Sequence, residues 1–359
     1  DVSVMHPTKI KNRRDFCFIR HFRFLEKYWK WLSLPKYFIM LKAGLVGAGH
    51  LGKIHLKLLQ QSELYELIGF YDPDKANGQK LEQEFGYRYF ENFEDLLKGV
   101  DMLDIVTPTV YHYDYAIKAI NVRKHFFIEK PVTQTLQQAE EILYKCREYG
   151  VKAQVGHVER YNPAFIATKS FIQNPMFIEI HRLAEFNPRG TDVSVVLDLM
   201  IHDLDILLSI VKSKVKIIHA SGVCVVSKTP DIANARIEFE NGCVANLTTS
   251  RISMKAMRKS RFFQKDAYIS VDFLEKKAEV IRMKEAPENP TAFDMIIENA
   301  EGEKNQILFE YPNIQPNNAI LDELNSFARA INEDKNVEVS LEDGTEALKM
   351  ALEIMRLIQ

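Results

Sequence analysis

The chain has 359 residues, of which 46% are hydrophobic and 27% charged, and its formal net charge is −2. This length is enough for two domains, and the near-neutral charge excludes the global basic field typical of proteins that bind nucleic acid or anionic membranes. No apolar run reaches the roughly 20 residues of a membrane span. We therefore expect a cytoplasmic globular protein with neither a nucleic-acid nor a membrane partner. Its cysteines are far apart and lack metal-type spacing, which favours free thiols: Cys17, Cys146, Cys224 and Cys243.

Residues 1–39 differ from the rest of the chain, because they are basic and aromatic and hold both tryptophans, Trp29 and Trp31. One interpretation is a targeting or membrane-surface segment, since basic aromatic helices can lie on membranes. The other is that Met40, directly before a strand that opens a domain, is the natural start. We adopt the second interpretation, expect residues 1–39 to be a non-native or disordered extension, and assign them no function.

From Leu41 onward, short apolar strands alternate with amphipathic helices, a pattern typical of βαβ units and of a doubly wound parallel sheet. Five strands are predicted, at 41–47, 66–72, 102–108, 125–131 and 151–157. Helices are predicted between them, at 48–61, 75–86, 111–121 and 135–150. We expect residues 40–157 to form a Rossmann domain in an α/β protein.

After residue 157 a helix is predicted at 162–173, and most of the chain to residue 312 is then strand-like. Asn241-Gly242 lies between two strand-like runs and is a strong hairpin signal. We expect residues 158–340 to form an α+β substrate and oligomerisation domain with a large, open, mostly antiparallel sheet. Amphipathic helices are predicted at 319–333 and 342–358, so that 341–359 is a C-terminal helix.

The first chemical motif is G-x-G-x-x-G, formed by Gly47, Gly49 and Gly52 between the first strand and the first helix. In this context the first glycine permits a tight turn, the second lets the backbone approach a pyrophosphate, and the third allows close helix packing. The helix N-terminus would offer N–H groups and a positive dipole end to the phosphates. We expect the loop, including His50 and Leu51, to bind a dinucleotide.

Asp72 ends the second strand, twenty residues after Gly52. A carboxylate at this position accepts hydrogen bonds from the adenosine ribose hydroxyls and repels a 2′-phosphate. The sequence therefore predicts NAD as the cofactor, with NADP disfavoured.

Polar residues also follow the third and fourth strands, and ligands bind outside the carboxyl ends of parallel strands. Thr107 and Pro108, with His112 beyond them, would line the cofactor at the third strand. Glu129 and Lys130 end the fourth strand and would face the nicotinamide. A lysine at that position can donate a hydrogen bond to a substrate hydroxyl or carbonyl group.

The apolar run Val195–Ile210 contains four ionisable residues, which are costly to bury unless they are paired or functional. At about 100° per residue, Asp198, His202 and Asp205 fall within roughly 60° of one another on a helix. Asp203 points away and is predicted to be a surface or capping charge. A self-satisfied buried carboxylate–imidazole pair and an Asp-His-Asp metal site are alternatives, but hydride chemistry requires no metal and we expect none.

Taken together, the glycine motif, Asp72, Thr-Pro with a histidine beyond, Glu-Lys-Pro and D-x-x-x-H-x-x-D resemble the Gfo/Idh/MocA family of oxidoreductases. The resemblance implies that Lys130 is catalytic. It also implies that Asp198 and His202 contact the reacting sugar carbon, with His202 as the acid/base.

The segments 155–165 and 191–206 resemble the nucleotide-sugar members of that family, such as UDP-N-acetylglucosamine 3-dehydrogenases. This resemblance implies that Arg160 and Asn162 bind a nucleotide sugar, whose secondary alcohol is oxidised by NAD. It also implies a homodimer or homotetramer formed through the C-terminal sheet. A free hexose or inositol dehydrogenase, or a catalytically silent NAD-binding regulator, remains an alternative.

Overall fold

The computed structural model of the chain describes residues 39–187, 193–291 and 294–358. Residues 1–39 and 40–359 form separate units, and the predicted extension and Cys17 lie outside the described residues, apart from Ile39. Within the described ranges, no helix is both long enough and apolar enough to cross a membrane.

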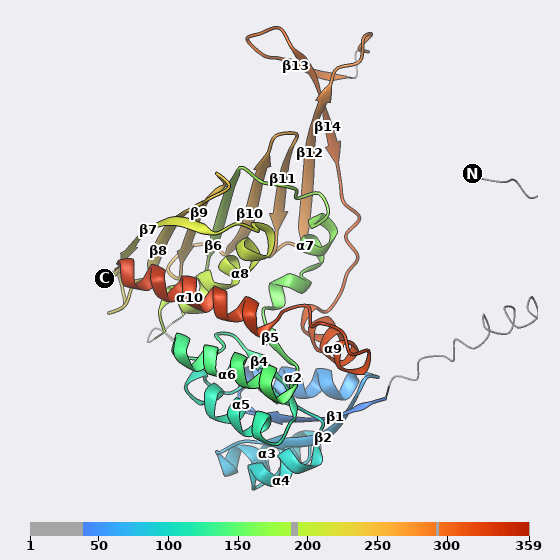
Figure 1. The fold of residues 1–359 in the computed structure, drawn as a ribbon, viewed down its shortest axis with the longest axis vertical. Coiled ribbons are helices and arrows are strands. Elements are labelled where there is room, and N and C mark those ends of the chain that lie inside the picture. The colour runs from blue at the N-terminus through green and yellow to red at the C-terminus, as the bar shows by residue number, and fades with distance from the viewer. Residues whose placement is uncertain (1–38, 188–192, 292–293, 359) are drawn as a thin grey trace, which may run out of the picture. The chain divides into compact units, whose positions relative to one another are not determined.

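A five-stranded parallel sheet occupies the N-terminal half of the body in the order β2-β1-β3-β4-β5 (Figure 1). The predicted doubly wound parallel sheet is thereby confirmed. Its strands are β1 (Leu41–Val46), β2 (Tyr65–Tyr71), β3 (Met102–Ile105), β4 (His125–Glu129) and β5 (Ala153–Gly156). Its helices are α2 (His50–Gln61), α3 (Lys75–Phe85), α4 (Phe93–Gly99), α5 (His112–Asn121) and α6 (Leu136–Tyr149).

Helices cover both faces of this sheet. Apolar residues of α2 and α3 share one buried cluster with the inward strand residues, and Phe327 of α9 (Ala319–Asn332) joins them. Apolar residues of α4, α5 and α6 form the cluster on the other face, together with Leu348 of α10 (Leu341–Ile358). Because the strands are parallel, the carboxyl ends of β1, β3 and β4 meet at one edge of the sheet.

The second sheet has nine described strands in the order β13-β14-β12-β11-β10-β6-β9-β8-β7, and of these pairings only β6 with β9 is parallel. The predicted large, mostly antiparallel sheet is confirmed, as is the hairpin at Asn241-Gly242, where Gly242 has φ +86°. The strands are β6 (Phe177–Leu183), β7 (Val215–Val223), β8 (Ile232–Phe239), β9 (Val244–Ser250), β10 (Met257–Gln264), β11 (Ala267–Asp272), β12 (Lys277–Glu285), β13 (Met295–Glu298) and β14 (Lys304–Glu310).

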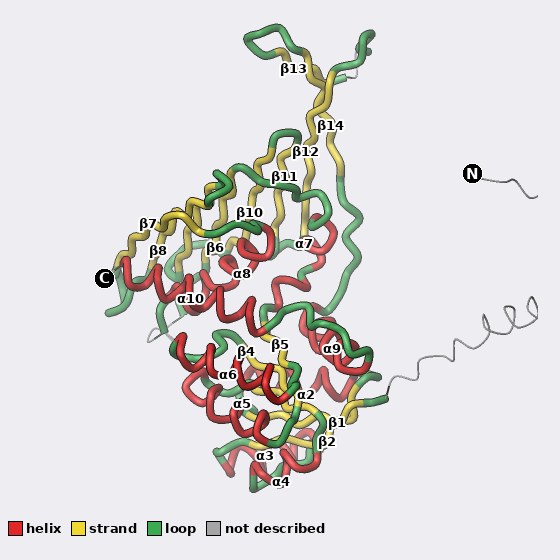
Figure 2. Tube along the Cα trace, viewed as in Figure 1, coloured by secondary structure: helices red, strands yellow, loops and turns green. Residues whose placement is uncertain are grey.

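Three helices pack on this sheet: α7 (Pro163–Thr168), α8 (Ile201–Ile210) and α10 (Figure 2). A π-helical segment, η3 (Val196–Met200), leads into α8, and a 3₁₀ turn, η2 (Val158–Tyr161), precedes α7. The helix predicted at 162–173 is therefore shorter than expected. Helix α10 contacts α6 and β5 of the first half as well as α8 and β7 of the second.

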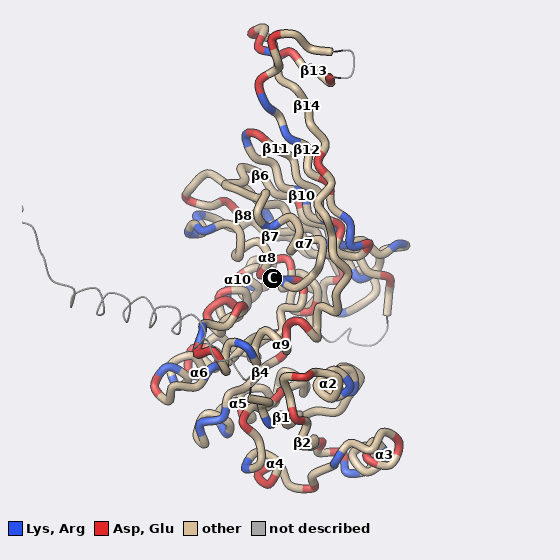
Figure 3. The backbone as a smooth tube through the Cα atoms, turned by 90° about the vertical axis from the view of Figure 1, so that its right-hand side faces the viewer, with Lys and Arg blue, Asp and Glu red and all other residues tan. Residues whose placement is uncertain are grey.

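Charged residues of both signs are interspersed along the helices and strands of the described body (Figure 3). This distribution agrees with a net charge of −2.

Candidate active site

The glycine-rich loop has a geometry that fits a dinucleotide. Gly47 has φ +95°, and a Cβ there would lie 2.8 Å from Thr107. A Cβ on Gly52 would lie 2.0 Å from the carbonyl oxygen of Gly47, so that only glycine allows α2 to approach the loop this closely. Gly49 is the N-cap of α2, and among the described residues no side chain caps it. The loop thus leaves the α2 N-terminus available to an anion.

Asp72 directly follows β2, and its carboxylate holds the glycine-rich loop by a hydrogen bond. One carboxylate oxygen accepts hydrogen bonds from Ala48 N at 2.8 Å and Asn77 Nδ2 at 3.3 Å, and the other accepts from Asp74 N at 2.9 Å. The residue is 8% exposed. Its carboxylate therefore lies beside the glycine loop, as a ribose-binding role requires, while also holding that loop in place.

His112 connects two loops at the carboxyl edge of the sheet. Its Nε2 lies 2.8 Å from Thr107 O and its Nδ1 lies 2.9 Å from Pro131 O. The ring is buried, and this burial lowers its pKa despite the carbonyl groups around it. His112 therefore links the loop after β3, which holds Thr107 and Pro108, to the loop after β4, which holds Pro131, and helps to fix both loops.

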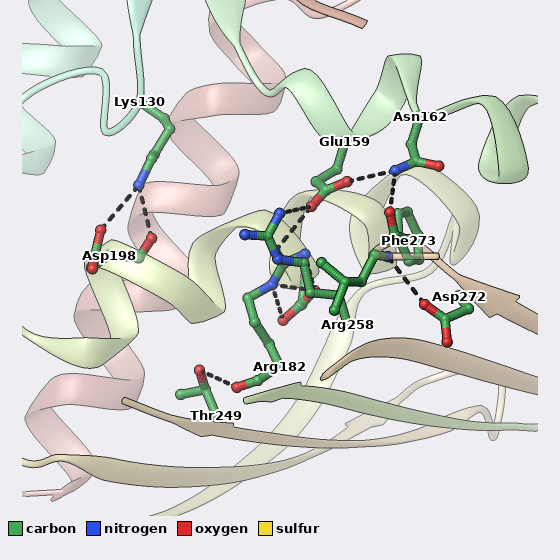
Figure 4. A network of polar contacts seen from close by, with 11 residues as sticks. Lys130, Glu159, Asn162, Arg182, Asp198, Thr249, Arg258, Asp272 and Phe273 are labelled. Atoms are coloured by element: carbon green, nitrogen blue, oxygen red, sulfur yellow. Dashed lines mark hydrogen bonds and ion pairs between the residues drawn. The ribbon is translucent and has the colours of Figure 1, made fainter. Parts of the chain in front are cut away.

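Lys130 follows β4, and its side chain meets the segment that carries Asp198 (Figure 4). Its Nζ donates a hydrogen bond to Asp198 O at 2.8 Å and lies 3.5 Å from Asp198 Oδ1. The peptide bond to Pro131 is cis. Burial lowers the pKa of Lys130, against the opposing charges of Asp198 and Glu129. The side chain of Asp198, on the π-helical segment η3, is 53% exposed and remains available to a ligand.

His202 lies one helical turn after Asp198, in the first turn of α8. Its Nδ1 is buried without a hydrogen-bond partner among the described residues, and its ring centroid lies 6.4 Å from that of His157. Burial holds the pKa of His202 well below its ordinary value, and the charges of Lys130 and Arg182 lower it further. The imidazole is therefore neutral at neutral pH and can accept a proton.

Arg160 and Asn162, the predicted nucleotide-sugar ligands, are engaged elsewhere. Arg160 forms two 2.7 Å hydrogen bonds to the carboxylate of Asp205. Asn162 caps α7 by accepting from Ala164 N at 3.1 Å. No hydrogen bond or ion pair between described side chains links either residue to Lys130. Arg160 instead borders a separate cavity of about 420 Å³ that is also lined by Tyr161, Ile166, Lys169, Asp322, Ser326, Arg329 and Glu338.

The prediction that Asp203 is a surface or capping charge is wrong. Asp203 is 4% exposed and forms a buried ion pair with Arg182 of β6, with an Nη2–Oδ1 distance of 2.8 Å. Arg182 also donates to Glu159 at 2.9 Å, and Arg258 lies 3.6 Å from the same carboxylate (Figure 4). Because α8 packs on the large sheet, the face of the helix opposite Asp198 meets β6 instead of water.

Sequence reasoning missed Arg182 and Glu159, although one signal pointed to Arg182. In β6 it continues the period-two series of inward residues begun by Ile178 and Ile180, a position that a lone charge does not occupy. A buried cation there requires a buried anion nearby, and Asp203 supplies it.

Comparison with protein families finds two matches. Residues 41–157 match the model of the oxidoreductase family with an NAD-binding Rossmann fold, and residues 174–264 match that of the GFO/IDH/MocA C-terminal domain. The chain is 35% identical over 237 residues to UDP-N-acetylglucosamine 3-dehydrogenase of Acidithiobacillus ferrooxidans, which covers 66% of this chain and 75% of the relative. It is 28% identical over 232 residues to scyllo-inositol 2-dehydrogenase (NAD(+)) of Bacillus subtilis, which covers 59% and 68% of the two chains.

Solved structures agree with this assignment. A structure of the Acidithiobacillus ferrooxidans UDP-N-acetylglucosamine 3-dehydrogenase superposes with a TM-score of 0.80 at 29% identity, covering 89% of this chain and 100% of the other. Apo scyllo-inositol dehydrogenase of Lactobacillus casei has a TM-score of 0.70 at 20% identity over 89% and 96% of the two chains, a likeness of fold alone. The chain therefore belongs to the Gfo/Idh/MocA family of oxidoreductases and carries its NAD-binding Rossmann domain.

Proposed function

We propose that this protein oxidises a secondary alcohol of a nucleotide sugar with NAD, and that UDP-N-acetylglucosamine is the substrate to test first. The observation that carries the proposal is the contact between Lys130 and Asp198 at the carboxyl edge of the parallel sheet. It joins a half-buried cation to an exposed carboxylate at the edge that also holds the glycine loop. The relative with 35% identity, a UDP-N-acetylglucosamine 3-dehydrogenase, supports the choice of substrate.

Bound NAD would supply the hydride acceptor, and the protein would supply position and proton transfer. In our proposal, His202 accepts the proton of the substrate hydroxyl, because its lowered pKa keeps the imidazole neutral. The ammonium group of Lys130 stabilises the negative charge that develops on the oxygen. Asp198 accepts a hydrogen bond from a neighbouring hydroxyl and so orients the sugar. The products are a keto sugar, NADH and one proton.

The cofactor contacts are also proposals. Gly47, Gly49 and Gly52, with His50 and Leu51, would hold the pyrophosphate. Asp72 would bind the ribose, and Thr107, Pro108 and Glu129 would line the nicotinamide. His112 would hold the loops after β3 and β4 in position. Arg160 and Asn162 would take part in sugar-nucleotide binding only after giving up their present partners, Asp205 and the start of α7.

The experiment is to incubate the purified protein with NAD and a panel of UDP-N-acetylglucosamine, free N-acetylglucosamine, glucose and inositols, and to follow NADH by absorbance. NADH formed with the nucleotide sugar but not with free sugars would support the proposal. Turnover of an inositol or a free hexose instead would move the protein to the alternative substrate class. Binding of NAD without reduction by any member of the panel would favour a regulator.

We also propose that the chain forms a homodimer or homotetramer through the large sheet. In β8 and β9, buried residues alternate with partly exposed ones, so that one face of the sheet packs on the helices and the other faces outward. Light scattering coupled to size exclusion would test this assembly, and a monomer at micromolar concentration would contradict it. The free thiols of the described cysteines agree with the cytoplasm as the proposed compartment.

A further inference from the structure

A second group of ionisable side chains adjoins the candidate active site and consists of His55, Asp104 and Glu129. His55 on α2 is fully buried, and its Nδ1 lies 2.9 Å from Oδ2 of Asp104 on β3, which is also fully buried. The Nε2 of the same ring lies 3.4 Å from Oε1 of Glu129, the last residue of β4. One imidazole thus joins two carboxylates from neighbouring strands of the parallel sheet.

Glu129 connects this group to Lys130. The main-chain N–H of Lys130 donates a hydrogen bond to Oε2 of Glu129 at 3.2 Å, while the other carboxylate oxygen faces His55. Gly156, paired with Glu129 across β4 and β5, leaves the space that this carboxylate occupies, because a Cβ on Gly156 would lie 2.7 Å from Oε1. The position of the Glu129 side chain is therefore set from three sides.

The imidazole of His55 favours the charged form of both carboxylates. Burial alone would lower the pKa of His55, but the charge and hydrogen bond of Asp104, with the carboxylate of Glu129, raise it to about 10. Burial would raise the pKa of Glu129, but contact with His55 and the charge of Lys130 hold it below its ordinary value. Glu323 of α9 also interacts with the group, and burial, with the charge of Glu129, raises its pKa well above the usual range.

We propose that His55 and Asp104 are positioning residues that hold the Glu129 carboxylate and, through it, the main chain from which Lys130 reaches the cleft. The inference rests on the proposed role of Lys130. A buried ion pair contributes little net stability over apolar residues of similar size. Positioning explains why three ionisable groups gather at the carboxyl edge of the sheet, where one of them, Glu129, accepts a hydrogen bond from the main chain of Lys130.

Three variants disturb this arrangement at different points. His55→Gln removes the imidazolium, and Asp104→Asn removes its strongest partner. Gly156→Ala pushes the Glu129 carboxylate aside but removes none of the three ionisable groups. His125→Gln is the matched control, because His125 begins β4 at the opposite edge of the sheet, where its ring accepts a hydrogen bond from Lys152 N.

The primary measurement needs no substrate. Lysines of the NAD-free protein are reductively methylated with ¹³C, and the Lys130 resonance is assigned with Lys130→Arg and titrated by NMR. We expect the chemical shift and titration midpoint of Lys130 to change in the three variants and to stay at their original values in His125→Gln. With a turned-over substrate, kcat should fall by about 10- to 100-fold, with KM for NAD and substrate within about threefold of the parent protein.

An unchanged Lys130 titration in the folded variants would overturn the proposal, and so would a loss confined to KM. If His55→Gln and Asp104→Asn do not fold, Gly156→Ala decides, because it keeps the buried charges. Failure of the proposed function can be told apart from failure of this inference. If no substrate is turned over, the kinetic measurement is lost, but the NMR titration of Lys130 still tests the inference.

Discussion

Arg182 of β6 and Asp203 of α8 form a buried ion pair in which three hydrogen bonds of 2.8 to 3.0 Å join the guanidinium to the carboxylate. The pair fastens the helix that carries His202 to the large sheet. It also explains how an apolar helix tolerates a second acidic residue next to the candidate base.

Removing one partner of this pair should destabilise the fold strongly. Asp203→Asn leaves the Arg182 guanidinium buried with only part of its compensation, and we expect the free energy of unfolding to fall by about 3–5 kcal/mol. Chemical denaturation measures the loss. The control is Arg356→Ala, which removes an exposed ion pair with Glu353 and should change stability by less than about 0.5 kcal/mol. Equal effects of the two variants would contradict the importance of burial.

Replacement of the proposed base should separate binding from turnover. We expect His202→Ala to bind NAD with unchanged affinity and to lose more than about 100-fold in kcat, because no other group would accept the hydroxyl proton. Calorimetry and NADH formation measure the two quantities. His219→Ala, which alters an exposed histidine on β7, should retain full activity. Turnover that survives in His202→Ala would remove this residue from the mechanism.

The lowered pKa of His202 predicts the acid limb of the activity profile. The imidazole must be neutral to act as base, and burial keeps it neutral below the ordinary histidine pKa of about 6.5. On lowering the pH, kcat should therefore fall only at values clearly below 6.5. A pH series of initial rates at saturating NAD measures this limb. An apparent pKa at or above 6.5 would assign the limb to a different group.

The raised pKa of His55 predicts a stability that declines in alkali. Between the unfolded value of about 6.5 and the folded value of about 10, the folded chain binds one more proton than the unfolded chain. The stability contributed by His55 is fully present below pH 6.5 and is lost as the pH rises toward 10, by up to about 1.4 kcal/mol per pH unit. Denaturation at several pH values should show this slope in the parent protein and a flatter one in His55→Gln.

Asp72 should control the choice between NAD and NADP. In Asp72→Asn the charge that repels a 2′-phosphate is gone, while an amide oxygen can still accept from Ala48 N. We expect the ratio of the two dissociation constants to shift toward NADP by about tenfold or more. Asp74→Asn is the control, because Asp74 caps α3 without bonding to the glycine loop. A ratio that shifts equally in both variants would show that the charge at position 72 is not the determinant.

The Rossmann half was predictable because its signals are local: glycines at a strand end and a period-two or helical pattern. Even so, α4 was missed, since seven residues carry little periodicity. Strand β10 was missed because its sequence MRKSRFFQ contains three cations, yet Ser260 and Phe262 face the core.

Within the site, helical angles and motifs in the sequence indicated which residues lie on one face, but they did not predict which residues form contacts with one another. The angle that separates Asp203 from Asp198 does not say which face of α8 meets the sheet. His55 has no local signal, since Asp104 lies 49 residues away and the two meet through the packing of α2 on β1 and the pairing of β1 with β3. Likewise, the bond between Arg160 and Asp205 depends on how α8 packs beside η2.

Helix α10 couples the stability of the two halves of the body. Leu348 belongs to the core of the Rossmann sheet, whereas Met350, Ala351 and Ile354, within two turns of it, belong to the core of the large sheet. Neither core is complete without α10, so the unfolding of one half should destabilise the other. We therefore expect residues 40–359 to melt in one transition, and a chain that stops before Leu341 to lose folded structure in both halves.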